Sequence, residues 1–135
     1  SVDQVDAFRP ASFDTVLMLG NNFGLLGGAR RAQRRLKQLS RITTPAARII
    51  AGTRDPHLST DPDDLRYYRR NRQRGRLPGQ FRLRVRFRRI TGDWFDYLLA
   101  SPQEMEQVLA GSDWRIERLI GSGEPAYYAV IGRRP

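Results

Sequence analysis

Residues 13 to 28 read Phe13-Asp14-Thr15-Val16-Leu17-Met18-Leu19-Gly20-Asn21-Asn22-Phe23-Gly24-Leu25-Leu26-Gly27-Gly28. The apolar run from Val16 to Leu19 does not alternate with polar residues, which is typical of a strand covered on both faces in a parallel α/β sheet. We therefore expect a strand over Thr15–Leu19 that ends in a Gly/Asn turn. Ligands of open α/β sheets bind beyond the carboxyl ends of the strands, so the segment predicts a site at this turn.

The residues that follow predict a βαβ unit. Apolar residues recur every three or four positions from Leu25 to Leu39, which indicates an amphipathic helix over about Gly27–Arg41. Thr43-Thr44-Pro45 is expected to end this helix, and a short apolar strand is expected to follow over Ala46–Gly52. Two strands joined by a helix are expected to be parallel, with a right-handed crossover. The arginines between the apolar helix positions are explained by a solvated helix face.

Composition limits the class of protein. The 135 residues suit one domain, and 24 Lys plus Arg against 14 Asp plus Glu give a formal charge of +10. Lys37 is the only lysine, so the excess reflects either the codon bias of a GC-rich genome or an anion-binding surface. The absence of cysteine excludes disulfides and thiolate metal sites. We find no membrane-spanning run and no signal-peptide pattern, and expect a cytoplasmic protein without a membrane partner.

The middle of the chain is rich in arginine. A polar loop holds the only histidine, His57, and Asp61 precedes a predicted helix over Pro62–Arg72. Eleven arginines and no acidic residue lie between Arg66 and Arg89. Apolar residues alternate with arginines over Phe81–Phe87, which predicts a strand with one buried face, and a return strand over Trp94–Ala100 would complete a β-hairpin. The arginine face could pair with Asp96, lie in water, or hold an anionic substrate or RNA.

The last third predicts a helix and two strands. Ser101-Pro102-Gln103-Glu104 is a capping box with proline at the first helical position, and Gly111 ends the helix. Strands are expected over Trp114–Ile120 and Ala126–Ile131, close enough to pair as an antiparallel hairpin.

This order of elements resembles the second half of a class I S-adenosylmethionine-dependent methyltransferase, whose sheet has the strand order 3-2-1-4-5-7-6. Residues 13–22 are similar to its fourth strand and the following turn, and Ala47–Gly52 is similar to its fifth. The remaining similar segments are the last helix and the hairpin of strands six and seven, at Ser101–Gly111, Asp113-Trp114-Arg115 and Tyr127–Val130. The resemblance implies one α/β domain over residues 1–135: half of a Rossmann-like sheet, with an inserted helix and antiparallel β-hairpin at about 61–100.

The first half of that family's pattern is absent from this sequence. No strand precedes a G-x-G-x-G loop, and no acidic residue closes a second strand. We interpret the chain as the carboxyl-terminal part of a methyltransferase that acts on an unknown, small-molecule acceptor. S-adenosylmethionine is then the cofactor of the complete protein, and we expect the isolated chain neither to bind it nor to be active.

Site residues follow from the resemblance. Gly20, Asn21, Asn22 and Phe23 are expected at the cofactor, although both asparagines could instead only accept left-handed turn geometry. His57 could be a general base or a solvated loop residue. Substrate contacts are expected from Arg54, Tyr68 and Trp94, for which surface charge and packing are the alternatives. No metal site is expected.

Partners follow from the missing strands. The strand at residues 15–19 would be an unprotected edge. We expect the amino-terminal half, a second copy of the chain, or residues 1–12 to cover it. The alternative function is an arginine-rich nucleic-acid-binding α/β module without catalysis, which would use Arg66–Arg89.

Overall fold

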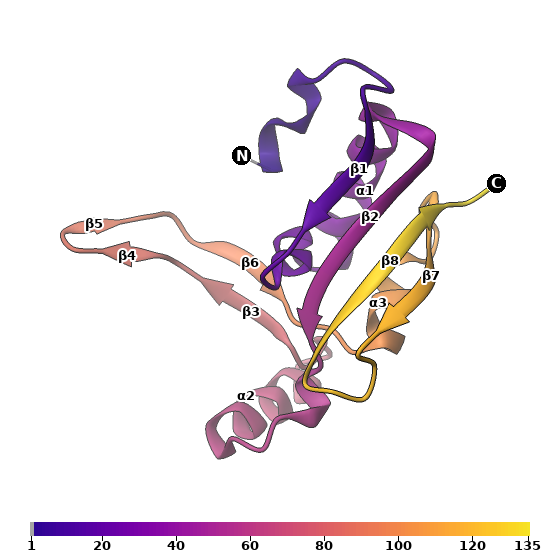
Figure 1. Cartoon of the computed structure of the whole chain (residues 1–135). Coiled ribbons are helices and arrows are strands. Elements are labelled where there is room, and N and C mark those ends of the chain that lie inside the picture. Colours follow the sequence, from indigo (N-terminus) through magenta and orange to yellow (C-terminus); the bar gives the residue numbers. More distant parts are fainter. Residues whose placement is uncertain (1) are drawn as a thin grey trace.

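The computed structural model describes residues 2–135, and the side chains from residue 4 onward. Four strands form one mixed sheet in the order β1-β2-β8-β7 (Figure 1). Their bounds are β1 (Phe13–Met18), β2 (Thr43–Arg54), β7 (Trp114–Ile120) and β8 (Ala126–Arg133). β1 and β2 are parallel, whereas β2–β8 and β8–β7 are antiparallel. The βαβ unit and the closing hairpin are confirmed, and the order matches 4-5-7-6.

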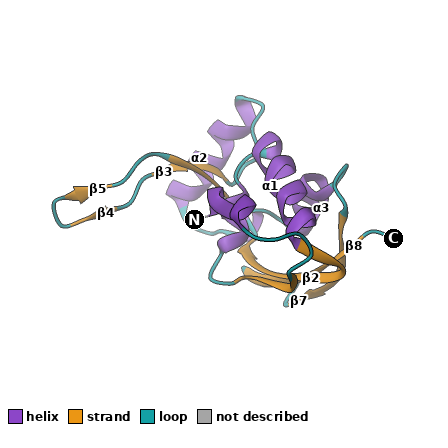
Figure 2. Ribbon diagram, turned by 90° about the horizontal axis from the view of Figure 1, so that it is seen from above, coloured by secondary structure: helices purple, strands orange, loops and turns teal. Residues whose placement is uncertain are grey.

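Helices α1 (Ala29–Ile42) and α3 (Pro102–Leu109) cover one face of this sheet (Figure 2). The two helices contact each other through Gln33, whose side-chain amide donates to the carbonyls of Val108 and Ala110 at 2.8 Å each. Trp114, fully buried on β7, donates from its indole nitrogen to the Leu36 carbonyl on α1 at 3.1 Å. These contacts join α1, from the first third of the chain, to α3 and β7, from the last third, in one core. The buried helix residues of this core include Ala32, Leu36, Leu39, Met105 and Val108.

The other face of the sheet is open. Side chains alternate along each strand, so the pairing of Leu17 with Ile50 puts these two residues on the face away from α1. Leu17 is 63% exposed, and Tyr128 and Ile120 are exposed farther across the same face. The prediction that β1 is covered on both faces is therefore wrong for this chain, because no described helix packs on that side.

The amino-terminal 3₁₀ helix η1 (Val2–Ala7) lies against α1 and does not cover β1. Its Asp6 carboxylate accepts from the side chains of Arg41 at 2.8 Å and Gln38 at 2.6 Å. Within residues 2–135, β1 pairs only with β2. Residue 1 lies outside the described residues. Residues 2–12 therefore add no strand to the β1 edge, and their contact with β1 is the edge-on packing of Phe8 against Phe13, with ring centroids 5.2 Å apart.

A long antiparallel ribbon leaves the body of the molecule (Figure 1). It consists of β3 (Gln80–Leu83) paired with β6 (Phe95–Leu98), and of β4 (Arg86–Phe87) paired with β5 (Ile90–Thr91). At its base Phe81 stacks on Tyr67 with ring centroids 4.8 Å apart. Farther out, Val85 is 64% and Phe87 65% exposed. The expectation of one buried face along residues 81–87 is therefore wrong beyond the base, because the ribbon extends past everything that could cover it.

The 3₁₀ helix η3 (Pro56–Leu58) and helix α2 (Pro62–Gln73) follow β2 in the chain, and α2 lies below the base of the ribbon in the view of Figure 1. The Asp61 carboxylate caps α2 by accepting from the Asp63 amide at 2.8 Å. Asn71, buried on α2, donates to the carbonyls of Pro78 and Gln80 at 2.8 Å each. Asn71 therefore fixes the direction in which the ribbon leaves α2.

The capping box of α3 provides a test of the fold. Ser101 Oγ accepts from the Glu104 amide, and the Glu104 carboxylate accepts from the Ser101 amide at 2.8 Å. Ser101→Ala is expected to lower the free energy of unfolding by about 1 kcal/mol, because it leaves a buried helix amide unsatisfied. Urea denaturation followed by circular dichroism measures this. The control is Gln103→Ala, an exposed change in the same helical turn that should leave the midpoint unchanged; an equal loss in both variants would contradict the assignment.

Candidate functional site

The carboxyl ends of β1 and β2 meet at one edge of the sheet. β1 ends at Met18, and the chain then turns through Gly20 and Asn21, which both adopt left-handed conformations with φ of 63° and 65°. The 3₁₀ helix η2 (Asn22–Leu26) leads from this turn to α1. The left-handed geometry explains glycine and asparagine at these two positions.

The ribbon is held against this turn by one hydrogen bond. Tyr97 on β6 donates from its hydroxyl to the backbone carbonyl of Asn21 at 2.6 Å. Burial raises the pKa of the Tyr97 phenol, so the hydroxyl keeps the proton that it donates. The Tyr97 ring packs directly over Gly24, where a Cβ atom would lie only 2.6 Å from the Tyr97 Cζ atom. Glycine at position 24 is therefore needed for this close approach.

The four residues expected at the cofactor differ in accessibility. Gly20 and Asn22 are exposed, and nothing lies within 4 Å of where a Cβ of Gly20 would be. Asn21 is half-buried, and its carbonyl is taken by Tyr97. Phe23 is fully buried in the core. Its side chain is thus a packing residue and no free contact for a ligand, whereas Gly20 and Asn22 present an open surface.

A cavity of about 360 Å³ lies past the carboxyl end of β2. Arg54 and Tyr68, both expected at the substrate, line it together with Asp61, Asp64 and Phe81. Burial, and secondarily the Asp64 carboxylate, raises the pKa of the Tyr68 hydroxyl, which is therefore a neutral donor. The structure thus brings Arg54 and Tyr68 together in one cavity that has both charged and aromatic walls.

His57 lies next to this cavity, but its ring is occupied. Its Nε2 is 2.8 Å from Oε1 of Glu104, and its Nδ1 accepts from the Arg72 guanidinium at 3.2 Å. These partners fit the tautomer with the proton on Nε2. Both ring nitrogens of His57 therefore bond to residues of neighbouring helices. In this structure neither nitrogen is available to take a proton from a substrate, as the predicted general base would have to do. The partner Glu104 is 47 residues away in sequence, and its capping role gave no sign of this contact.

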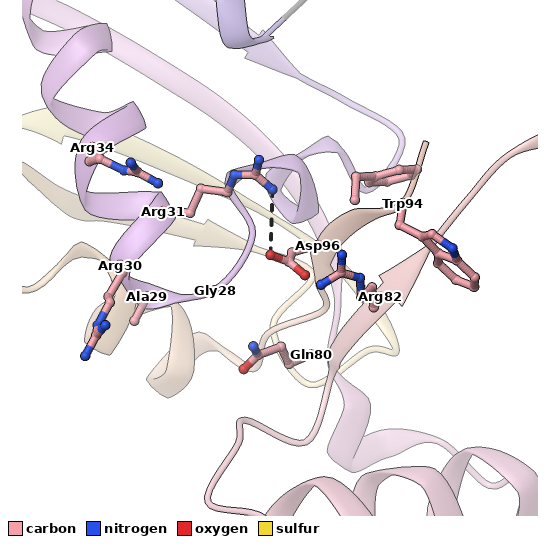
Figure 3. A pocket seen from close by; sticks show the side chains of 10 residues that line it. Gly28, Ala29, Arg30, Arg31, Arg34, Gln80, Arg82, Trp94 and Asp96 are labelled. Carbon is pink, nitrogen blue, oxygen red and sulfur yellow. Dashed lines mark ion pairs between the residues drawn. The ribbon is translucent and has the colours of Figure 1, made fainter. Parts of the chain in front are cut away.

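Trp94 lies apart from Arg54 and Tyr68. It lines a second cavity, of about 580 Å³, between the start of α1 and the ribbon (Figure 3). The other charged residues of this cavity are Arg30, Arg31, Arg34, Arg82 and Asp96. The sequence pointed to Arg82 and Asp96 as part of the arginine face of the strand, but it gave no sign that the three α1 arginines join them. The α1 arginines fit a solvated helix face equally well, and only the tertiary position of the ribbon turns that face into a cavity wall.

Among the side chains of residues 4–135, no group of three or more His, Asp or Glu could hold a metal ion. No described helix is both long and apolar enough to cross a membrane.

Comparison with known proteins relates this arrangement to solved structures. No protein-family model matches the sequence, and no curated protein does either. A SAM-dependent methyltransferase from Bacteroides fragilis, in complex with S-adenosyl-L-homocysteine, matches 97% of this chain with a TM-score of 0.72 and 24% identity. A SAM-dependent methyltransferase from Methanosarcina mazei matches 96% of it, with a TM-score of 0.64 and 14% identity. The CcbJ methyltransferase from Streptomyces caelestis matches 95% of this chain, with a TM-score of 0.56 and 12% identity.

The chain corresponds to only part of each of these proteins. It covers 52% of the Bacteroides chain, 64% of the Methanosarcina chain and 59% of the Streptomyces chain. At these identities the likeness concerns the fold. In strand order, strand direction and the position of its helices, this chain has the fold of the class I S-adenosylmethionine-dependent methyltransferases.

Proposed function

We propose that this chain is the carboxyl-terminal part of an S-adenosylmethionine-dependent methyltransferase that methylates a small-molecule acceptor. The observation that carries the proposal is the mixed sheet β1-β2-β8-β7, with its one parallel pair and its likeness to methyltransferase structures. Nucleic-acid binding by Arg66–Arg89 is not proposed, because the solved structures named above are all methyltransferases.

The residues present fit one wall of a cofactor site. Gly20 and Asn22 offer an exposed turn at the end of β1, which is the edge where α/β sheets bind ligands. The sequence holds no G-x-G-x-G loop after a strand that could supply a second wall. When bound, S-adenosylmethionine would supply the methyl group. The contribution of this chain is to position: the turn would border the cofactor, and Arg54 and Tyr68 would orient an acceptor in their cavity.

The remaining walls would come from a complementary segment. The β1 edge carries unpaired backbone groups, and the open face beside it exposes Leu17 and Tyr128. A segment that adds strands beside β1 and helices on the open face would satisfy both. The amino-terminal half of the same fold has this character, and its absence from the chain agrees with coverage of 52% of the Bacteroides protein. In the isolated chain, a second copy would take that place.

The proposal predicts that the isolated chain has no saturable affinity for the cofactor. A site with only one wall leaves most of the surface of a nucleoside-sized ligand in water. The few contacts that remain do not offset the translational and rotational entropy that the ligand loses on binding. Isothermal titration calorimetry with S-adenosylmethionine, and with S-adenosyl-L-homocysteine as the product, should show only heats of dilution. A micromolar dissociation constant for either compound would contradict the division of the site between two segments.

The proposal also predicts self-association of the isolated chain through the sheet. Leu17→Lys should shift the chain toward monomer in sedimentation equilibrium, because it places a charge on the apolar face beside the β1 edge. The matched control is Val85→Lys on the ribbon, since Val85 is 64% and Leu17 63% exposed. If the Val85 change dissociates the chain and the Leu17 change does not, the ribbon is the contact and the proposed partner surface is wrong.

A further inference from the structure

The charged lining of the second cavity consists mainly of arginines. We define the arginine cleft by Arg30, Arg31, Arg34, Arg82, Trp94 and Asp96, which line about 580 Å³ of space. Three arginines come from the first two turns of α1, whereas Arg82, Trp94 and Asp96 come from the ribbon. Figure 3 shows Arg31 and Arg34 of α1 directed toward Asp96 and Arg82 of the ribbon, whereas the Arg30 side chain and the Trp94 indole point away, and Gln80 lies below.

The cleft carries an excess of positive charge. Four guanidinium groups share it with one carboxylate, that of Asp96. Asp96 pairs with Arg31 at 3.6 Å, and Arg82 lies opposite Asp96 on the paired strand. Arg30, Arg34 and Arg82 make no ion pair with a carboxylate among residues 4–135, whose side chains the structure describes. Like charges gathered in a concave site with low-dielectric walls raise the local concentration of anions.

The arginines of the cleft differ from those elsewhere on the ribbon. Arg86, Arg88 and Arg89 lie near its tip, where the chain is exposed on all sides and lines no described cavity. In the cleft, guanidinium groups approach one volume from two elements, which allows several of them to bind the same group of oxygens. Trp94 stands at the ribbon side of the cleft and is 53% exposed as a residue, and the Arg84 guanidinium lies 4.8 Å from the centroid of its ring.

The cleft lies close to the turn that the proposed function places at the cofactor. Gly28 at the start of α1 borders the cleft, and η2 is the only element between it and Asn21. On the ribbon side, Asp96 is adjacent to Tyr97, whose hydroxyl binds the Asn21 carbonyl. A ligand that reaches from the turn toward the ribbon would therefore meet the arginines.

We propose that the arginine cleft binds an anionic group, phosphate or carboxylate, of the methyl acceptor. The word acceptor rests on the proposed function, whereas the anion site itself does not. Without ligand, Asp96 partly neutralises Arg31. An incoming anion completes the neutralisation through Arg34 and Arg82, and the arrangement of several planar donors favours groups with two or three oxygens.

Binding can be measured on the whole chain without any cofactor. Inorganic phosphate, inorganic pyrophosphate and citrate are titrated by calorimetry, which separates phosphate from carboxylate recognition. The change in tryptophan fluorescence is recorded in parallel. Trp114 is fully buried, so the fluorescence change should come from Trp94 and be lost in Trp94→Phe. We expect saturable binding of one equivalent of at least one of these anions.

Matched variants separate a site from general charge attraction. Arg34→Gln with Arg82→Gln should weaken anion binding roughly tenfold for each lost guanidinium. Arg69→Gln with Arg115→Gln removes the same charge from exposed positions outside the cleft and should change affinity by less than about twofold, as expected for screened surface charges. Equal weakening in both pairs, or no saturable binding of any of the three anions, would overturn the proposal.

A third variant tests the site by gain of affinity. Asp96→Asn removes the carboxylate that competes for Arg31, and anion binding should strengthen by about threefold to tenfold. This result does not depend on whether the arginine variants fold, and circular dichroism confirms that each variant is native. Weaker or unchanged binding in Asp96→Asn would contradict the cleft as the site. Since no cofactor is present, failure of the proposed methyl transfer would leave these outcomes unaffected, and the reverse also holds.

Discussion

The structure depends on the parallel pairing of β1 with β2, the two strands that α1 connects. Val16 pairs with Ile49, and Met18 pairs with Ala51. Leu36 and Leu39 of α1 pack in the same hydrophobic core as these strand residues. Parallel pairing directs both strands toward the same edge. Everything that bears on function follows from this, because the turn after β1, the cavity after β2 and the start of α1 all lie at that edge.

The ribbon reaches this edge by packing against η2, and its strands do not pair with the four-stranded sheet. The Tyr97 ring over Gly24 and its hydrogen bond to Asn21 fix the base of the ribbon against η2. Asn71 fixes the same base from α2. The arginine cleft exists only because these contacts place Arg82 opposite the first turns of α1. A small residue at position 24 is therefore a condition for the cleft as well as for the turn.

The sequence predicted what depends on local patterns. The strand Trp114–Ile120 and the capping box at Ser101 appear as expected, since periodicity and capping are properties of neighbouring residues. The strand order followed from the resemblance. The sequence overestimates the burial of Val85 and Phe87, which are exposed beyond the base of the ribbon. Their alternation with arginines shows that the strand has an apolar and a charged face, but it does not show whether another element covers the apolar one.

The site was less predictable because its contacts join distant segments. Arg54 and Tyr68 were identified singly, and only the fold shows that they share a cavity. His57 has a carboxylate partner that the sequence could not identify, because Glu104 already had a sufficient local role as the α3 cap. The α1 arginines had an adequate explanation as a solvated face. In each case a residue satisfied a local rule, and its second contact came from an element far away in the chain.

The open side of the sheet links the fold to the site. Among the described residues, β1 has one strand neighbour and one covered face, so the turn at Gly20–Asn22 is attached to an edge strand of the sheet. Local stability follows the number of buried contacts, and the end of β1 should open more readily than β2 or β8. A segment that covers β1 would order this turn before a ligand arrives, and it would lower the entropy cost of binding. Under the proposed function, completion of the sheet and formation of the cofactor wall are therefore one thermodynamic event.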